Sequence, residues 1–260
     1  MSLIPLNPER FAGARWQPMP DSAFAREVGL VELNASELPA AICHLPVGLL
    51  RLGEGPWTLQ AVLSVQPGKN LFVAADGSWL GGHWPLRLRL APFALARSET
   101  GEDVLCVNDA WWRPLESGGI AFYTDGGDLG PETAAVLQEC RDLVANQRHT
   151  HAALAALEET GLIRPWNPVI PTAAGNVQLA GIFAVDETAL NALEGAVLQN
   201  LRDAGALAIA YCQLLSMQHA RKLGELADAH ARLDEGRRAA AAELFSGLLS
   251  NDESINLGNL

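Results

Sequence analysis

The sequence contains few of the residue patterns that carry chemistry. Nothing in its 260 residues matches G-x-x-x-x-G-K-[ST] or a G-x-G-x-x-G after a strand, the glycine signatures of nucleotide-binding loops. The G-x-S-x-G elbow of serine hydrolases is also missing. QPGKN (66–70) comes nearest to a phosphate loop, but one glycine beside one lysine is typical of a hairpin turn. We therefore expect no catalytic residue, no metal and no cofactor.

Cysteine is scarce. Cys43, Cys106, Cys140 and Cys212 lie far apart, without a Cys-x-x-Cys pair. Each has apolar neighbours, which favours buried and reduced thiols because free cysteine behaves as a small hydrophobic residue. This usage is typical of a reducing compartment, and we expect the protein to be cytoplasmic.

Basic residues and long apolar runs are also scarce. The 18 Lys and Arg against 30 Asp and Glu give a net charge of −12, which repels phosphate backbones and anionic membranes, so nucleic acid is not an expected partner. The longest nearly apolar stretch, LAIAYCQLL (207–215), is shorter than the roughly 18 residues of a membrane span. The N-terminus, MSLIPLNPERFAGARWQPMP, lacks the pattern of a signal peptide.

Histidine spacing does not predict a metal site. On a helix, His149 and His151 would point in nearly opposite directions and could not hold one ion together. His151 falls on the apolar line of Val144 and Leu154, which favours a position at an interface. His44 and His83 have no spacing that assigns them a carboxylate partner.

What the sequence does contain predicts an α+β fold. Apolar residues make up 49% of the chain, enough for a sizeable core. We interpret residues 1–24 as an extended arm and the rest of the N-terminal half as mainly β, with short helices between strands. The expected strands are 26–33, 46–52, 57–65, 70–75 and 102–108, and the expected short helices are 36–44 and 84–91.

A long helix opens the second half. Residues 131–160 carry an apolar stripe at three-four spacing, and Pro131 and Gly161 are the residues expected at its two ends. A β-hairpin over 166–185 is expected to follow.

A helical C-terminal region then completes the fold. GIFAVDETALNAL (181–193) changes from strand to helix, with Asp186 as the N-cap. A long helix is expected from Ala206 onward. We predict a single domain over 1–218, and a helical extension with a polar tail over 219–260.

The loop at 109–130 is a candidate contact surface. Its sequence, DAWWRPLESGGIAFYTDGGDLG, is too long for an ordinary connection and is dense in glycine, aspartate and aromatic residues. The rings of Trp111, Trp112, Phe122 and Tyr123 form either a surface for a partner or a lid over the core.

The C-terminal helix is a second candidate surface. Leu226 and Leu233 recur with Ala240 every seven residues, an imperfect heptad in which His230 and Arg237 occupy seam positions. This pattern indicates either a helix for a protein partner or homo-oligomer, or an amphipathic helix that docks on its own domain.

Two arginines are candidate ligand-binding residues. Arg26 follows Phe24-Ala25 and Arg97 ends PFALAR (92–97), each near an expected strand. They could clamp an anion through the forked guanidinium, or they could form structural ion pairs.

Several segments together resemble the SapC family of bacterial proteins, which is grouped with a component of a surface-array (S-layer) locus. The resemblance covers most of the chain. Its sharpest pieces are GIFAVDETALNAL (181–193) and AGALAIAYCQLLSM (204–217). The other matching pieces are PLNPER (5–10), FAREVGLVEL (24–33), ELPAAICHLPV (37–47), GKNLFVAADGSW (68–79) and PFALAR (92–97).

The resemblance implies an accessory role rather than a particular reaction. The family has no agreed catalytic residues, and its members tend to be encoded beside halogenase-like and oxygenase-like proteins and outer-membrane receptors. We therefore expect a non-enzymatic accessory or protein-interaction protein. The alternatives are a small-ligand-binding or auxiliary subunit of an oxygenase- or halogenase-associated system, and an S-layer structural component. The chain departs from the family pattern at Phe11, at HWPLRLRLAPF (83–93) and at NDAWWRPL (108–115).

Overall fold

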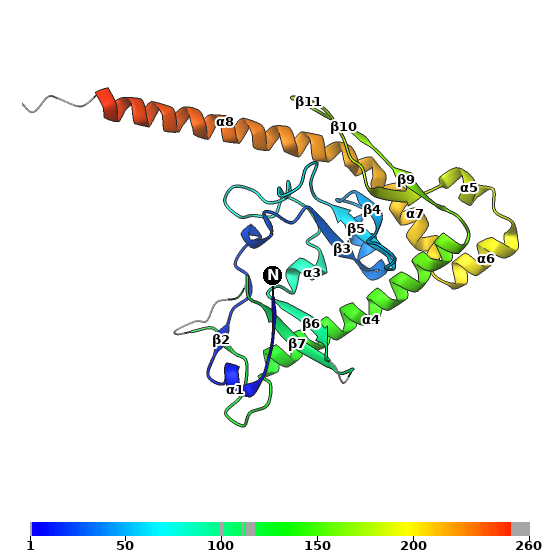
Figure 1. The fold of residues 1–260 in the computed structure, drawn as a ribbon, viewed down its shortest axis with the longest axis horizontal. Coiled ribbons are helices and arrows are strands. Elements are labelled where there is room, and N and C mark those ends of the chain that lie inside the picture. The colour runs from blue at the N-terminus through cyan, green and yellow to red at the C-terminus, as the bar shows by residue number, and fades with distance from the viewer. Residues whose placement is uncertain (1, 99–100, 111, 113–117, 251–260) are drawn as a thin grey trace, which may run out of the picture.

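The computed structural model describes residues 2–98, 101–110, 112 and 118–250, with side chains through Glu243. Strands dominate the N-terminal half and helices the C-terminal half, which confirms the α+β class (Figure 1). Buried apolar side chains gather in two clusters, here called the first core and the second core.

A five-stranded antiparallel sheet supports the first core. Its strand order is β3 (Leu30–Leu33), β5 (Trp57–Val62), β4 (Val47–Arg51), β12 (Ile182–Val185) and β9 (Ile163–Trp166). Because side chains alternate between the faces of a strand, one face collects a continuous apolar layer. The fully buried members of this layer are Leu33, Val47, Leu49, Leu59 and Ala61.

A buried glutamine joins the middle of this sheet to a helix. Strands β4 and β12 pair at Leu49 and Phe183. Next to this pair, Gln213 on α7 (Ala206–Ser216) accepts from the Val185 N–H at 2.9 Å and donates to the Val47 carbonyl at 3.0 Å. The side-chain amide thus satisfies one backbone group of each strand and fixes α7 to the sheet.

The second core is built largely from aromatic rings. Strands β1 (Leu3–Pro5), β7 (Asp103–Asn108) and β6 (Phe93–Arg97) form a three-stranded sheet, and β2 (Arg15–Trp16) pairs with β8 (Ile120–Ala121). The rings of Phe11 and Phe122 meet edge to face with centroids 5.1 Å apart. The rings of Trp16 and Phe93 do so at 4.7 Å.

Residues 4–16 of the segment expected as an extended arm, 1–24, are therefore part of the second core, whereas Phe24 packs against the first core. The segment contains β1, β2 and the single turn α1 (Pro8–Phe11), and both Phe11 and Trp16 are buried. These elements of two to four residues are too short to give a periodic pattern in a proline-rich segment. The strands pair with β7 and β8, which lie about a hundred residues away in the sequence, so no local signal predicts them.

The long helix α4 (Pro131–Glu159) connects the two cores, and Figure 1 shows it running along both sheets. Its first half buries Cys140 and Leu143 in the second core. Its second half buries Ala153, Leu154 and Leu157 in the first core. The apolar stripe predicted at three-four spacing is confirmed, and its residues pack into both cores.

Short helices and a hairpin complete the molecule. Asp186 caps α5 (Glu187–Asn191) as predicted, since its carboxylate accepts from the Ala189 N–H at 3.1 Å. The hairpin consists of β10 (Val169–Thr172) and β11 (Gly175–Gln178). The remaining helices are α2 (Leu38–Ala41), α3 (Leu86–Arg89), α6 (Gly195–Asp203) and α8 (Ala220–Ser250).

Three expectations about local structure are wrong. Residues 70–75 form a turn with one bridge, Val73 to Trp79, rather than a strand. The helix expected from Ala206 is interrupted by a 3₁₀ turn at Met217–His219, which separates α7 from α8. Cys43 is exposed, although Cys106 and Cys140 are buried as expected.

Replacing Gln213 by alanine should destabilise the fold strongly. The substitution leaves the Val47 carbonyl and the Val185 N–H buried without this partner, so we expect a loss of about 2–4 kcal/mol in the free energy of unfolding. Urea denaturation followed by circular dichroism measures it. The control Gln199→Ala, at an exposed position of α6, should change stability by less than about 0.5 kcal/mol. Equal effects of the two variants would contradict the structural role of Gln213.

Candidate functional site

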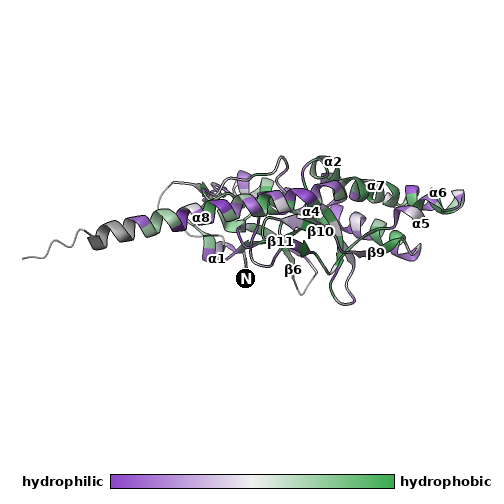
Figure 2. Ribbon diagram, turned by 90° about the horizontal axis from the view of Figure 1, so that it is seen from above, coloured by the Kyte–Doolittle hydropathy of each residue, from purple (hydrophilic) through white to green (hydrophobic). Residues whose placement is uncertain are grey.

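Helix α8 crosses the hairpin strand β10 at a glycine. A Cβ added to Gly224 would lie 2.1 Å from the carbonyl oxygen of Pro171 and 3.2 Å from Cγ2 of Ile170, so a larger residue does not fit without movement. The neighbouring Leu223 is fully buried in the first core. Figures 1 and 2 both show α8 passing beside the hairpin and then extending beyond the body of the molecule.

Polar contacts hold the next three turns of α8. The Asp228 carboxylate accepts from the Ala173 N–H at 2.7 Å, and His230 Nε2 lies 3.0 Å from the Leu71 carbonyl oxygen. Lys69 pairs with Asp234 at 3.3 Å. The hydrogen bond from Lys69, together with its charge, lowers the pKa of the Asp234 carboxyl below its usual value.

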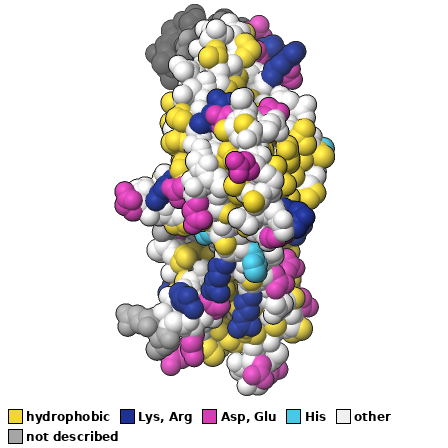
Figure 3. All heavy atoms as spheres, turned by 90° about the vertical axis from the view of Figure 1, so that its right-hand side faces the viewer, with side chains coloured by type: hydrophobic (Ala, Val, Ile, Leu, Met, Phe, Trp, Pro, Cys, Tyr) yellow, Lys and Arg dark blue, Asp and Glu magenta, His cyan; other side chains and the backbone are white. Residues whose placement is uncertain are grey.

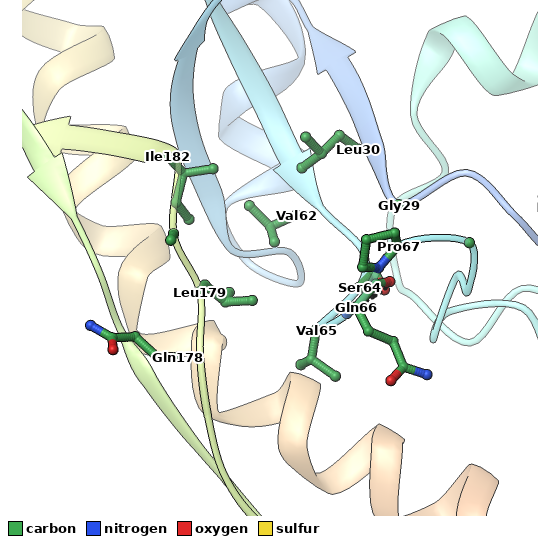
Figure 4. Close-up of a pocket in the computed structure, with 12 residues that line it drawn as sticks. Gly29, Leu30, Val62, Ser64, Val65, Gln66, Pro67, Gln178, Leu179 and Ile182 are labelled. Carbon is green, nitrogen blue, oxygen red and sulfur yellow. Dashed lines mark hydrogen bonds between the residues drawn. The ribbon is translucent and has the colours of Figure 1, made fainter.

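The loop 64–70 lines three hollows, two of which are also lined by α8. The first, the apolar cavity, has a volume of about 500 Å³. Figure 4 shows four apolar side chains around this cavity, those of Leu30, Val62, Leu179 and Ile182. This cavity lies on the face of the five-stranded sheet opposite Leu49 and Ala61. Leu30 and Val62 pair with each other and alternate with Val31 and Ala61, and Ile182 precedes Phe183, which pairs with Leu49.

The other two hollows lie between the loop and α8. The hairpin cavity, about 500 Å³, is lined by loop residues, by hairpin residues such as Thr172 and by α8 residues such as Asp228. The basic cavity, about 300 Å³, is lined by Arg26, Lys69, His230 and Arg237 together with two acidic residues. Lys69 lines both hollows, so the loop and the docked part of α8 form one continuous candidate site.

A fourth hollow, about 260 Å³, lies between α4 and β6 beside a polar network. Glu32 accepts from Arg87 at 2.9 Å and from Gln147, and it contacts His151 at 3.2 Å. His151 thus has the interface position that the sequence predicts. Cys140 also lines this hollow, and burial raises the pKa of its thiol to about 11, so the thiol is un-ionised near neutral pH.

The two candidate arginines lie in different places. Arg26 lines the basic cavity, where one of its Nη atoms donates to the Ala75 carbonyl at 2.8 Å. Arg97 ends β6 in the other sheet and donates to the Gly101 carbonyl at 3.1 Å. The cavity that holds Arg26 is not lined by Arg97, so the two guanidinium groups do not converge on one anion there.

The aromatic residues of the 109–130 loop pack largely on the second core. Phe122 is fully buried, which makes it unsuitable as a contact surface and assigns it to the alternative role of core residue. Trp112 lies against Phe11, with ring centroids 5.3 Å apart. Tyr123 is half-buried, and burial raises its pKa. Trp111 lies outside the described residues.

The leucines of the predicted heptad have different surroundings. Leu226 packs against the first core, whereas the side chain of Leu233 is 57% exposed at the edge of the basic cavity. Sequence reasoning missed Gly224, Lys69 and Arg237 as parts of a site. The sequence gives only weak signals for these residues. Lys69 lies in a segment typical of a turn, and Arg237 occupies a seam position of the heptad.

Metal-binding groups and membrane-spanning helices were sought among the described residues. Within 2–98, 101–110, 112 and 118–250, no group of three or more His, Cys, Asp or Glu could hold a metal ion. In the part of the chain that the structure describes, no helix is long and apolar enough to cross a membrane. Around α5 and α6, side chains of both charges are mixed with apolar ones, which is typical of a solvated surface (Figure 3).

Comparison with known proteins identifies the family. The fold and the loop–helix site define an α+β protein with two cores and a docked C-terminal helix. The SapC family model matches residues 6–223, most of the chain, and the chain therefore belongs to the SapC family. No curated protein and no solved structure matches it. The matched segment ends at the point where α8 crosses the hairpin.

Two glycines of α8 provide a matched pair of substitutions. Gly224→Ala should destabilise the docked helix by about 1–3 kcal/mol, because the added methyl group meets the Pro171 carbonyl. Gly236→Ala should stabilise the same helix by about 0.5–1 kcal/mol, since an added Cβ at Gly236 meets nothing within 4 Å.

Hydrogen exchange resolved by segment, together with urea unfolding, measures both effects. Gly224→Ala should reduce protection in α8 and β10, whereas Gly236→Ala should leave β10 unchanged. Equal protection of β10 in the two variants would show that the helix does not dock at Gly224.

Proposed function

We propose that this SapC-family protein is a non-enzymatic accessory protein that binds a protein partner, or a second copy of itself, through the projecting end of α8. The observation that carries this proposal is the asymmetry of that helix. Within 220–238 the helix contacts the hairpin and the neighbouring loops through Gly224, Asp228, His230 and Asp234, whereas all of residues 239–243 are exposed. Figure 1 shows the helix continuing well past the body.

A projecting helix needs a source of stability. Short helices are marginal in water on their own, and most helical stability in proteins comes from packing of an apolar face. The projecting end begins with four alanines, and the sequence then continues as ELFSGLLS (243–250), rich in leucine. This pattern is typical of helices that insert apolar anchors into the groove of another protein.

The cell compartment and the genetic setting belong to the same proposal. We infer a cytoplasmic protein from the reduced cysteines expected in the sequence, and an accessory role from the family resemblance. The alternative of a small-ligand-binding subunit is supported by one observation, the cationic hollow lined by Arg26. The third alternative, an S-layer structural component, predicts recovery in the envelope fraction.

Removing residues 239–260 should abolish association without unfolding the domain. The truncation retains Asp228, His230 and Asp234, the contacts that dock α8. Light scattering after gel filtration measures the mass in solution, and a pull-down at native expression measures partner capture. The matched control lacks only residues 251–260 and should behave like the full chain.

If the protein truncated after Arg238 keeps the same oligomeric mass and captures the same partner as the control, then the projecting end of α8 is not the contact surface. Unchanged circular dichroism and urea midpoint in both proteins would exclude misfolding as the cause of a loss.

A further inference from the structure

The basic cavity gathers three positive side chains from distant segments of an acidic chain. Arg26 comes from the segment before β3, Lys69 from the loop 64–70, and Arg237 from α8, where the imidazole of His230 also lines the cavity. The chain as a whole carries a net charge of −12, so such a concentration of cationic groups around one hollow of about 300 Å³ is unusual for this protein.

The acidic residues near the cavity are largely engaged. Asp234 pairs with Lys69 at 3.3 Å. Asp76, whose pKa is lowered by hydrogen bonds from Ser78 and to a smaller degree by the charge of Arg26, is held by Ser78 at 2.9 and 2.7 Å. Glu27 lines the cavity on an exposed position. The charge of Arg237 contributes less than that of Lys69 to the lowered pKa of Asp234. The three cationic side chains Arg26, Lys69 and Arg237 outnumber the two carboxylates, Glu27 and Asp234, that line the cavity.

The body side of the cavity is fixed before any ligand arrives. Asn70, which is 2% exposed, donates through its side chain to the Ala25 carbonyl at 3.0 Å and accepts from the Phe72 N–H at 2.9 Å. Its backbone N–H donates to the Arg26 carbonyl at 2.6 Å. The Arg26 side chain is in turn held by the Ala75 carbonyl at 2.8 Å. A guanidinium group held in this way loses little conformational freedom on binding.

We propose that the basic cavity binds the oxyanion group, phosphate or carboxylate, of a small molecule, with Arg26 and Lys69 on one side and Arg237 on the other. This site is independent of the proposed contact surface at residues 239–250. The forked donors of the two arginines match the geometry of such groups. The volume admits the anion and a few further atoms, which makes the ligand a small metabolite rather than a polymer.

Binding has a structural consequence for α8. Because the oxyanion contacts the body through Arg26 and the helix through Arg237, it stabilises the docked position of α8 and not the undocked one. Hydrogen exchange in residues 224–238 should therefore slow when the anion is bound.

Calorimetric titration with inorganic phosphate and with succinate, each compared with chloride at equal ionic strength, tests the site. We expect saturable binding of at least one probe, and the stronger one identifies the anion class. Arg26→Gln and Arg237→Gln should each weaken binding by about tenfold, the typical effect of a charge-assisted hydrogen bond. Arg237→Lys, which keeps the charge but removes the fork, should lie between these variants and the unaltered protein.

The control is Arg232→Gln, which removes the same charge from an exposed position of the same helix outside the cavity lining. It should keep the affinity within about twofold, since long-range charge effects are screened by salt. Absence of saturable binding for both probes, or equal loss in Arg232→Gln and Arg237→Gln, overturns the proposal. Partner capture by the chain truncated after Arg238 is a separate measurement, so failure of the anion site and failure of the proposed function remain distinguishable.

Discussion

The architecture depends on one helix that is buried at two separate places. Helix α4 contributes Cys140 and Leu143 to the aromatic second core and Leu154 and Leu157 to the first core. Burial of apolar surface is the main favourable term in folding, and here a single rigid element supplies it to both interiors. A movement of one sheet relative to the other that separated either from α4 would expose apolar surface of that helix, which opposes such a movement.

Several buried polar groups among the described residues have structural partners. Gln213 joins two strands, and Glu37 accepts from the backbone of Asn34 at 3.2 Å and of Leu86 at 2.6 Å while His83 approaches it at 3.3 Å. Because an unpaired buried polar group costs free energy, each such contact stabilises a particular packing arrangement. Side chains that would be candidates for acid–base chemistry in an open cleft thus have structural partners here.

The sequence was most informative where structure is local. The period of 131–160 and the Asp186 cap depend on residues within a few positions of each other, and the structure has both. The pairing of β1 with β7 depends on contacts across about a hundred residues, and no local pattern in LIP reveals it. The basic cavity is even harder to predict from the sequence, because Arg26, Lys69 and Arg237 come together only where α8 crosses β10. That close crossing requires a residue without a side chain at position 224.

The crossing at Gly224 also makes α8 a lever. A helix rises about 1.5 Å per residue, so Ser250 lies roughly 40 Å from the crossing point along the axis. A tilt of about 10° at the crossing would displace the tip by roughly 7 Å, by simple geometry of a rigid rod of that length. A change in the packing of Gly224 against Pro171 would thus be amplified along the helix, and the contacts of Asp228, His230 and Asp234 with the body oppose such a tilt.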